Sequence, residues 1–335
     1  MEREGKVQFL RHHQGSVRGV AFCPRDRYLF CSGAYDGKVN LYSAQKGDLL
    51  HTYNITTLSL ARNINAVRFT SDGCRILATT TARRLAIIDV ESGEQLGSYD
   101  SCAFNGRDRT GLAADPTNPS IALCCTVNGK GVTVFDLRMP LPLDFINDLH
   151  GNIIRDLTFL HDSWPWCKGQ SAFLSVSVDG TAKVTTLDGK TLQTVDCGSC
   201  LHSAAPTPEI YGSMADDGFY SLIMLGGDSI SAYVPEVGIQ ELLQEHGEAP
   251  VWKIRYTSNG SMLYSVCDNG MVRRYRRYPD HHEYLGEVFR HKSDIEDMDI
   301  SAYDEYLVTA SKDRTVGLLK LGAPNHGVTE YAELT

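Results

Sequence analysis

A six-residue pattern of apolar positions recurs along the whole chain. Apolar residues stand at its first, fourth and sixth positions, with mainly polar or small residues between them. Clear copies lie at 17–22, 64–69, 154–159, 251–256 and 295–300, and weaker copies lie near Leu112 and Ala204. The fourth positions are residues 20, 67, 112, 157, 204, 254 and 298, which are about 46 residues apart on average. A period of this length predicts a repeat architecture in which each repeat is one supersecondary unit.

Each repeat predicts short strands rather than helices. In the first repeat, apolar or alternating runs at 17–22, 28–32, 38–42 and 49–53 are separated by turns that contain Gly, Asp or Pro. Short runs of this kind, bounded by turn residues, are typical of β-strands. Seven repeats of four strands predict an all-β fold, a seven-bladed β-propeller of four-stranded antiparallel blades.

The repeats resemble the WD40 repeat. That family carries a His before the first strand, a Ser or Thr in the second strand, and an Asp in the turn that follows. Three repeats have such a set: His13, Ser32 and Asp36; His150, Ser175 and Asp179; and His291, Thr309 and Asp313. The third strand ends on Phe135-Asp136 in one repeat, although no repeat keeps Trp-Asp itself. The resemblance covers the whole chain and implies the propeller fold, but one fold hosts many functions.

The resemblance also implies how the ring closes. In WD40 propellers the outermost strand of the last blade comes from the other end of the chain. The last repeat ends with its third strand at 316–320, and an unassigned apolar stretch at 6–10 precedes the first repeat. We therefore expect the N-terminal strand to complete the last blade, which removes exposed strand edges. This predicts one propeller domain over residues 1–320 and a loose C-terminal tail over 321–335, and it leaves open whether the chain is one domain of a longer protein.

Residues that suggest catalysis or metal binding favour a structural interpretation. His13, Ser32 and Asp36 have the residue types of a hydrolase triad. An enzyme needs one active site, whereas this set recurs at matching offsets, which indicates hydrogen bonds that hold each turn to its blade. The lone pair Cys197 and Cys200 lacks the two further ligands that a zinc site requires. We expect no catalytic residue, no metal site and no cofactor.

Composition and charge narrow the class of protein. The chain has 335 residues, of which 42% are apolar, so it can bury a sizeable core. Its 32 Lys and Arg against 41 Asp and Glu give a net charge of −9, which disfavours bulk nucleic-acid binding. There is no signal-peptide pattern and no long apolar run, so neither secretion nor membrane insertion is expected. The ten cysteines are too sparse for a disulfide scaffold, which favours the cytoplasm and also fits the nucleus.

One rim of the ring is the first candidate for partner binding. In a propeller the first strands line the central channel, so the residue two before each anchor should face one end of it. The turns after the second strands should stand beside these residues. The predicted rim residues are Arg18, Tyr35, Arg155, His202, Trp252 and Lys312. This mixed basic and aromatic set suits an acidic peptide or one that bears Arg and aromatic residues, unless Trp252 instead fills the channel wall.

Three further segments are secondary candidates for partner binding. The basic run 273–277, with Arg273, Arg276 and Arg277, suggests a patch for phosphate or an acidic segment, or else a solvated strand end. Trp164 and Trp166 lie in an enlarged loop, where they would either anchor a partner or fold back over the blade. Asp136 and Arg138 resemble the ending of WD40 receptors that dock onto cullin-type ubiquitin ligases.

The sequence as a whole favours a non-catalytic scaffold or adaptor for other proteins. We expect a monomeric propeller that presents its rim to a peptide or folded partner within a multi-protein complex. Two alternatives stay open: a substrate receptor of a cullin-type ubiquitin ligase, and a binder of phosphate, nucleic acid or phosphoinositide through 273–277. Nucleic acid is the less favoured ligand because of the negative net charge.

Overall fold

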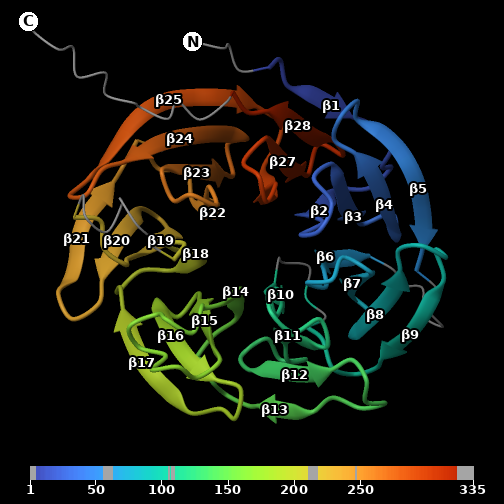
Figure 1. Ribbon diagram of the computed structural model, residues 1–335, viewed down its shortest axis with the longest axis horizontal. Helices are drawn as coiled ribbons and strands as arrows, with labels where there is room; N and C mark the ends of the chain where they lie inside the picture. Colours follow the sequence, from blue (N-terminus) through green and yellow to red (C-terminus); the bar gives the residue numbers. More distant parts are fainter. Residues whose placement is uncertain are drawn as a thin grey trace, which may run out of the picture.

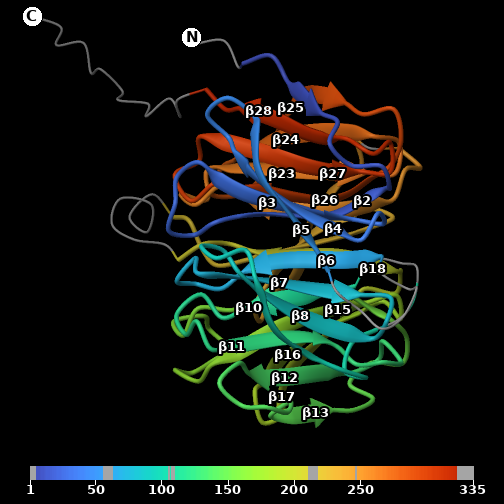
Figure 2. The same ribbon diagram turned by 90° about the vertical axis from the view of Figure 1, so that its right-hand side faces the viewer.

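Seven four-stranded antiparallel sheets surround a central axis and form a closed ring (Figure 1). This computed structural model describes residues 5–55, 63–104, 106, 110–209, 218–245 and 247–322. Most of the expected tail, residues 323–335, therefore lies outside the described part. The prediction of an all-β, seven-bladed propeller is confirmed. Seen from the side, the ring is a thick disc (Figure 2).

The first four blades follow the chain in order from the channel outward. Blade 1 contains β2 (Val17–Phe22), β3 (Leu29–Ala34), β4 (Lys38–Ser43) and β5 (Asp48–Asn54). Blade 2 contains β6 (Ile64–Phe69), β7 (Arg75–Thr80), β8 (Arg84–Asp89) and β9 (Gln95–Tyr99). Blade 3 contains β10 (Leu112–Ala114), β11 (Ile121–Cys125), β12 (Val132–Asp136) and β13 (Asp144–Ile146). Blade 4 contains β14 (Ile154–Phe159), β15 (Ala172–Ser177), β16 (Thr181–Thr186) and β17 (Thr191–Asp196).

The remaining blades repeat this order, and the last one draws its outer strand from the start of the chain. Blade 5 contains β18 (Leu201–Pro206), β19 (Ile223–Gly227), β20 (Ile230–Val234) and β21 (Gly238–Leu243). Blade 6 contains β22 (Val251–Tyr256), β23 (Met262–Cys267), β24 (Met271–Arg277) and β25 (His282–Arg290). Blade 7 contains β26 (Ile295–Ile300), β27 (Tyr306–Ser311), β28 (Val316–Lys320) and β1 (Gln8–Leu10).

Ring closure rests on the pairing of β1 with β28. The two strands are antiparallel, with Leu10 opposite Val316. The ring of Phe9 packs edge-on against His291, with centroids 4.9 Å apart. Both ends of the described chain thus lie in one blade (Figure 1), and the expected closure by the N-terminal strand is confirmed.

The hydrophobic core lies between neighbouring blades. One cluster joins Val20 and Phe30 of blade 1 to Val308 and Leu318 of blade 7. Because each blade is covered on both faces, strands such as β15 are buried along their whole length, whereas the outer strand β5 is mostly exposed. A ring packed in this way is rigid and presents its loops at the two ends of the channel.

Most of the channel-lining strands carry an irregularity at the same place. Their pairing with the second strand shifts by one residue just after the first residue of the strand. This β-bulge occurs in β2, β6, β14, β18, β22 and β26. The bulged residue has no direct pairing partner, and bulges commonly redirect a side chain.

Candidate functional site

The bulged residues occupy the predicted rim positions. They are Arg18, Asn65, Arg155, His202, Trp252 and Glu296. We call this set the bulge rim. A bulge leaves one residue out of the ladder and commonly changes the direction of its side chain. Six of the seven repeats thus carry a bulged residue at the predicted rim position.

One part of the bulge rim joins blades 1 and 7 through charge. The guanidinium of Arg18 lies 2.8 Å from the carboxylate of Glu296 and 4.9 Å from the ring centroid of Tyr35. The ammonium of Lys312 lies 3.1 Å from the same carboxylate and 2.6 Å from Asp294. Two cations therefore share Glu296, so this side of the rim is balanced in charge rather than basic.

A second part of the bulge rim is aromatic and joins blades 4, 5 and 6. The imidazole of His202 stacks on the indole of Trp252, with ring centroids 4.5 Å apart. The guanidinium of Arg155 lies 5.9 Å from the centroid of that indole. A cation and an imidazole beside one indole hold its ring in place.

The burial of these residues differs from the expectation. Arg18, Arg155 and His202 are only 5–9% exposed. Arg18 packs against Glu296 and Tyr35, whereas Arg155 and His202 pack against Trp252, so these three side chains position their neighbours rather than form the exposed surface. The more accessible of the predicted rim residues are Trp252 of the bulge rim and, beside it in the turns after the second strands, Tyr35 and Lys312, the last with a side chain that is 38% exposed.

Charged residues inside the channel were missed by the sequence analysis. Arg68 lies 2.9 Å from Asp297, which joins blade 2 to blade 7. The carboxylate of Asp299 in blade 7 accepts a hydrogen bond of 2.8 Å from the backbone N–H of Phe22 in blade 1. These residues stand at the third and fifth positions of the six-residue pattern. A charge at either position, between apolar neighbours, is the signal that would have identified them.

The His, Ser or Thr, and Asp residues of three repeats lie together in their blades. His13 Nε2 lies 2.7 Å from Ser32 Oγ, and its Nδ1 lies 2.9 Å from Asp36. Asp36 also accepts hydrogen bonds from the backbone N–H groups of Gln14 and Lys38. Burial raises the pKa of Asp36, but His13 and these N–H groups outweigh that effect and lower it below its usual value.

The other two sets vary the same arrangement. His291 lies 2.7 Å from Thr309 and 3.0 Å from Asp313. In blade 4, His150 lies 2.8 Å from Ser175, but Thr181 takes the place nearest its Nδ1 at 2.8 Å, with Asp179 at 3.4 Å. All three imidazoles are buried between blades, where they connect a turn to a strand.

The basic run of β24 does not form the expected surface patch. Successive residues of a strand face opposite sides, so Arg273 and Arg277 share the inward side of Tyr275. Both are buried, at 4% and 3% exposure, and only Arg276 is exposed. Arg277 donates to the carbonyl of Tyr220, and burial lowers the pKa of its guanidinium. The patch prediction is therefore wrong for Arg273 and Arg277.

The two tryptophans of the blade 4 loop fold back onto the core. Trp164 is 1% exposed and belongs to the cluster between blades 4 and 5. Trp166 is partly buried beside Tyr233, with ring centroids 5.9 Å apart. This burial corrects the prediction of Trp164 as a surface anchor, because its indole packs in the hydrophobic cluster and is not available to a partner.

Asp136 and Arg138 lie together at the end of β12. The guanidinium of Arg138 contacts both carboxylate oxygens of Asp136, at 2.8 and 2.6 Å. This pairing lowers the pKa of Asp136 to about 2. The Arg138 side chain is 68% exposed, so it stays accessible from the outside of blade 3.

Three further observations concern metal binding, the two predicted thiols and membranes. Within the described ranges, no three His, Cys, Asp or Glu side chains gather in a way that would hold a metal ion. Cys197 and Cys200 both occur as free thiols of intermediate exposure. The part of the chain described here has no helix long and apolar enough to cross a membrane.

Three comparisons with known proteins agree with this architecture. The WD40 model, described as "WD domain, G-beta repeat", matches residues 5–43, 239–276 and 283–318. Eukaryotic translation initiation factor 3 subunit I from Pyricularia oryzae is 23% identical over 302 residues, which cover 84% of this chain and 83% of the relative. The subunit of the same name from Aspergillus oryzae is 22% identical over 310 residues, covering 83% of this chain and 84% of the relative.

A solved structure shows the same fold. A chain in the crystal structure of a mitotic checkpoint complex superposes with a TM-score of 0.75 over 96% of this chain and 94% of that chain, at 13% identity. The first match of the family model, residues 5–43, contains the closing strand together with the first three strands of blade 1. The chain thus contains WD40 repeats and folds as a closed β-propeller of seven blades.

Proposed function

We propose that the protein is a non-catalytic scaffold that holds a peptide or folded partner at the bulge rim, within a multi-protein complex. The observation that carries this proposal is the recurrence of one β-bulge at one position of six channel-lining strands. It gathers side chains from separate blades at one end of the channel. A rigid ring offers these side chains with little change of shape on binding.

The accessible members of the rim define the contact surface. Trp252 is held by His202 and Arg155, and Tyr35 is held by Arg18. Rigid aromatic side chains supply contact area at a low cost in conformational entropy, which is why they are frequent in interfaces. Lys312 adds a partly exposed cation. We infer a peptide that brings an apolar or aromatic residue together with an acidic one.

The relatives support the role in a complex. Both are named as subunits of a translation initiation factor, so propellers similar to this one work as parts of larger assemblies. The same names favour a cytoplasmic location, since eukaryotic translation takes place there. The alternative of a cullin-type ligase receptor depends on Arg138 alone, because the carboxylate of Asp136 is already engaged by this arginine.

Affinity purification with mass spectrometry tests the proposal. The wild type is compared with a double variant, Tyr35→Ala with Trp252→Ala. A matched control is Tyr303→Ala, because Tyr303 is 63% exposed and lies in the loop after β26, at the opposite end of the channel. We expect the double variant to lose partners that the control retains. Equal recovery of partners by all three proteins would show that the rim is the wrong surface.

A further inference from the structure

The opposite end of the channel contains a large cavity. It has a volume of about 740 Å³ and is lined by residues from four successive blades, 3 to 6. They lie at or just after the ends of β10, β14, β18 and β22, whereas the bulge rim lies at the starts of β14, β18 and β22. Since a strand rises about 3.3 Å per residue, the two sites lie at opposite faces of the ring.

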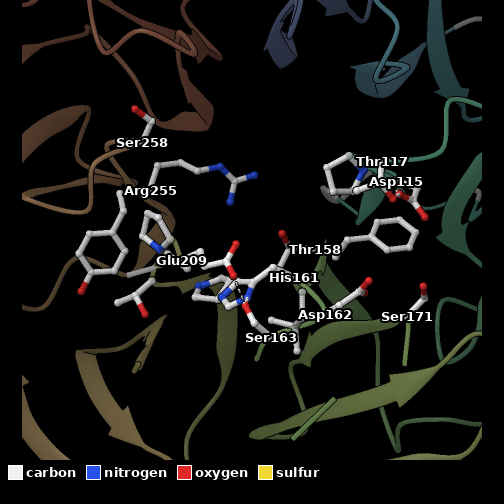
Figure 3. Close-up of a pocket in the computed structure, with 18 of the residues that line it drawn as sticks. Asp115, Thr117, Thr158, His161, Asp162, Ser163, Ser171, Glu209, Arg255 and Ser258 are labelled. Atoms are coloured by element: carbon white, nitrogen blue, oxygen red, sulfur yellow. Dashed lines mark hydrogen bonds between the residues drawn. The ribbon is translucent and has the colours of Figure 1, made fainter. Parts of the chain in front are cut away.

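Arg255 is the central polar group of this cavity. Figure 3 shows its side chain extending from β22 into the open middle, between Ser258 on one side and Thr117 on the other. Its guanidinium has no hydrogen bond or ion pair with any residue in the portion of the chain that the structure describes. The partly buried carboxylate of Asp299 attracts it without a hydrogen bond or ion pair between the two side chains. A guanidinium offers five donors in a planar fork, so Arg255 is equipped to receive an anion.

Three acidic side chains line the cavity, Asp115, Asp162 and Glu209, and two of them accept hydrogen bonds from nearby groups. Asp115 accepts hydrogen bonds from the backbone N–H groups of Thr117 and Asn118, at 2.8 and 2.9 Å. Glu209 accepts a hydrogen bond from the hydroxyl of Ser163. Asp162 is exposed at the rim of the cavity. Three carboxylates near one arginine repel a dianion such as phosphate. They repel a single carboxylate less strongly, and its direct contact with Arg255 offsets that repulsion.

The remaining walls are apolar. Phe159 and Leu160 line the side of blade 4, and Pro206 and Pro208 line the side of blade 5. Phe159 ends β14 and Arg255 belongs to β22, so the aromatic ring and the guanidinium come from different blades. Concave sites with apolar walls and one oriented polar group are typical of specific ligand binding.

We propose that this cavity binds a peptide segment through one carboxylate, which pairs with Arg255, and a neighbouring apolar or proline side chain, which lies against Phe159. The carboxylate belongs to an Asp or Glu side chain or to the C-terminus of the segment. The site goes beyond the scaffold role proposed for the bulge rim and does not depend on it, because it uses different residues at the other face.

Selection from a displayed library of random peptides tests this site. Peptides that bind the wild type are selected without any variant present, and the survivors are synthesised and titrated against the wild type and Arg255→Met. We expect survivors with an acidic residue beside an apolar one, and an affinity at least about tenfold lower for Arg255→Met, because a charged hydrogen-bond pair is lost. Arg276→Met, which removes an exposed arginine on the outer part of blade 6, is the matched control and should bind as the wild type does.

Further variants separate the possible outcomes. Asp162→Asn removes an exposed negative charge at the cavity edge and should tighten binding about two- to fivefold, which keeps the test valid even if Arg255→Met fails to fold. Synthesis with a free or an amidated C-terminus distinguishes the two sources of the carboxylate. Peptides that bind Arg255→Met as well as the wild type, or that are lost only in Trp252→Ala, would overturn the cavity site; the second result would still support the rim.

Discussion

The ammonium of Lys253 lies 2.6 Å from each carboxylate oxygen of Asp156, and both side chains are buried in the channel wall. The pair joins blade 6 to blade 4. Between them, Ser203 of blade 5 donates a hydrogen bond of 2.8 Å to the same carboxylate. These contacts join three blades at one point. They depend on two charged groups that are buried away from water.

Replacing Asp156 by Ala should be among the most destabilising single changes in this protein. The variant leaves the Lys253 ammonium buried without its carboxylate and removes the acceptor of Ser203. We expect the free energy of unfolding to fall by about 3–5 kcal/mol, measured by urea denaturation. The double variant Asp156→Leu with Lys253→Met should recover much of the loss, since it removes both charges. A loss below about 1 kcal/mol in Asp156→Ala would contradict the role of this pair.

Replacing Asp36 by Ala should weaken the fold without touching the partner surface. Asp36 accepts hydrogen bonds from two backbone N–H groups and lies beside His13, so the variant leaves these donors unpaired. We expect a loss of about 1–3 kcal/mol in the free energy of unfolding, with partner binding retained below the melting temperature. An unchanged melting temperature would rule out this structural role.

His150 should make stability depend on mild acid. Burial lowers its pKa to about 4 from the ordinary value of 6.5, although Asp179 opposes this effect and Lys183 adds to it. Between pH 6.5 and 4 the unfolded chain therefore binds a proton that the folded chain does not. The contribution is fully present above pH 6.5 and is lost as the pH falls through this window, with a slope of up to about 1.4 kcal/mol per pH unit.

The variant His150→Gln isolates this effect. It should be less stable than the wild type at pH 7, because the hydrogen bonds to Ser175 and Thr181 are disturbed. The pH slope of its free energy of unfolding between pH 6.5 and 4 should nevertheless be shallower. Parallel slopes for the two proteins would assign the acid sensitivity to other groups.

Removal of residues 1–10 should open the ring. The deletion exposes the edge of β28 and removes Phe9 from its contact with His291. We expect a lower melting temperature together with self-association on size-exclusion chromatography, because an unpaired strand edge recruits other chains. A monomeric truncated protein with the melting temperature of the full chain would show that β1 is dispensable.

Local pattern was enough to predict the blades, because the six-residue pattern repeats wherever a strand lines the channel. The rim stays a prediction, although the residue it names relative to the anchor is the bulged residue of six strands. What the sequence did not reveal was burial by the neighbouring blade. Arg18, Arg155 and Arg277 look exposed in their own strands but are buried against residues from outside their own blades: Glu296, Trp252 and Phe219.

Contacts between distant repeats were also beyond local pattern. Asp156 and Lys253 are 97 residues apart, and neither strand alone indicates that the two charges meet. The cavity around Arg255 is assembled from four strand ends. Such features depend on how seven blades are arranged around one axis, which a single repeat does not encode.

Site-specific photo-crosslinking tests the scaffold account most directly. A benzoylphenylalanine residue is placed at Tyr35, beside Arg18 on the bulge rim, or at Tyr303 on the opposite face, and each protein is irradiated in cells. If partners bind at the bulge rim, those recovered with the wild type are crosslinked at position 35. Crosslinking of those partners at position 303 with none at position 35 would contradict binding at the bulge rim.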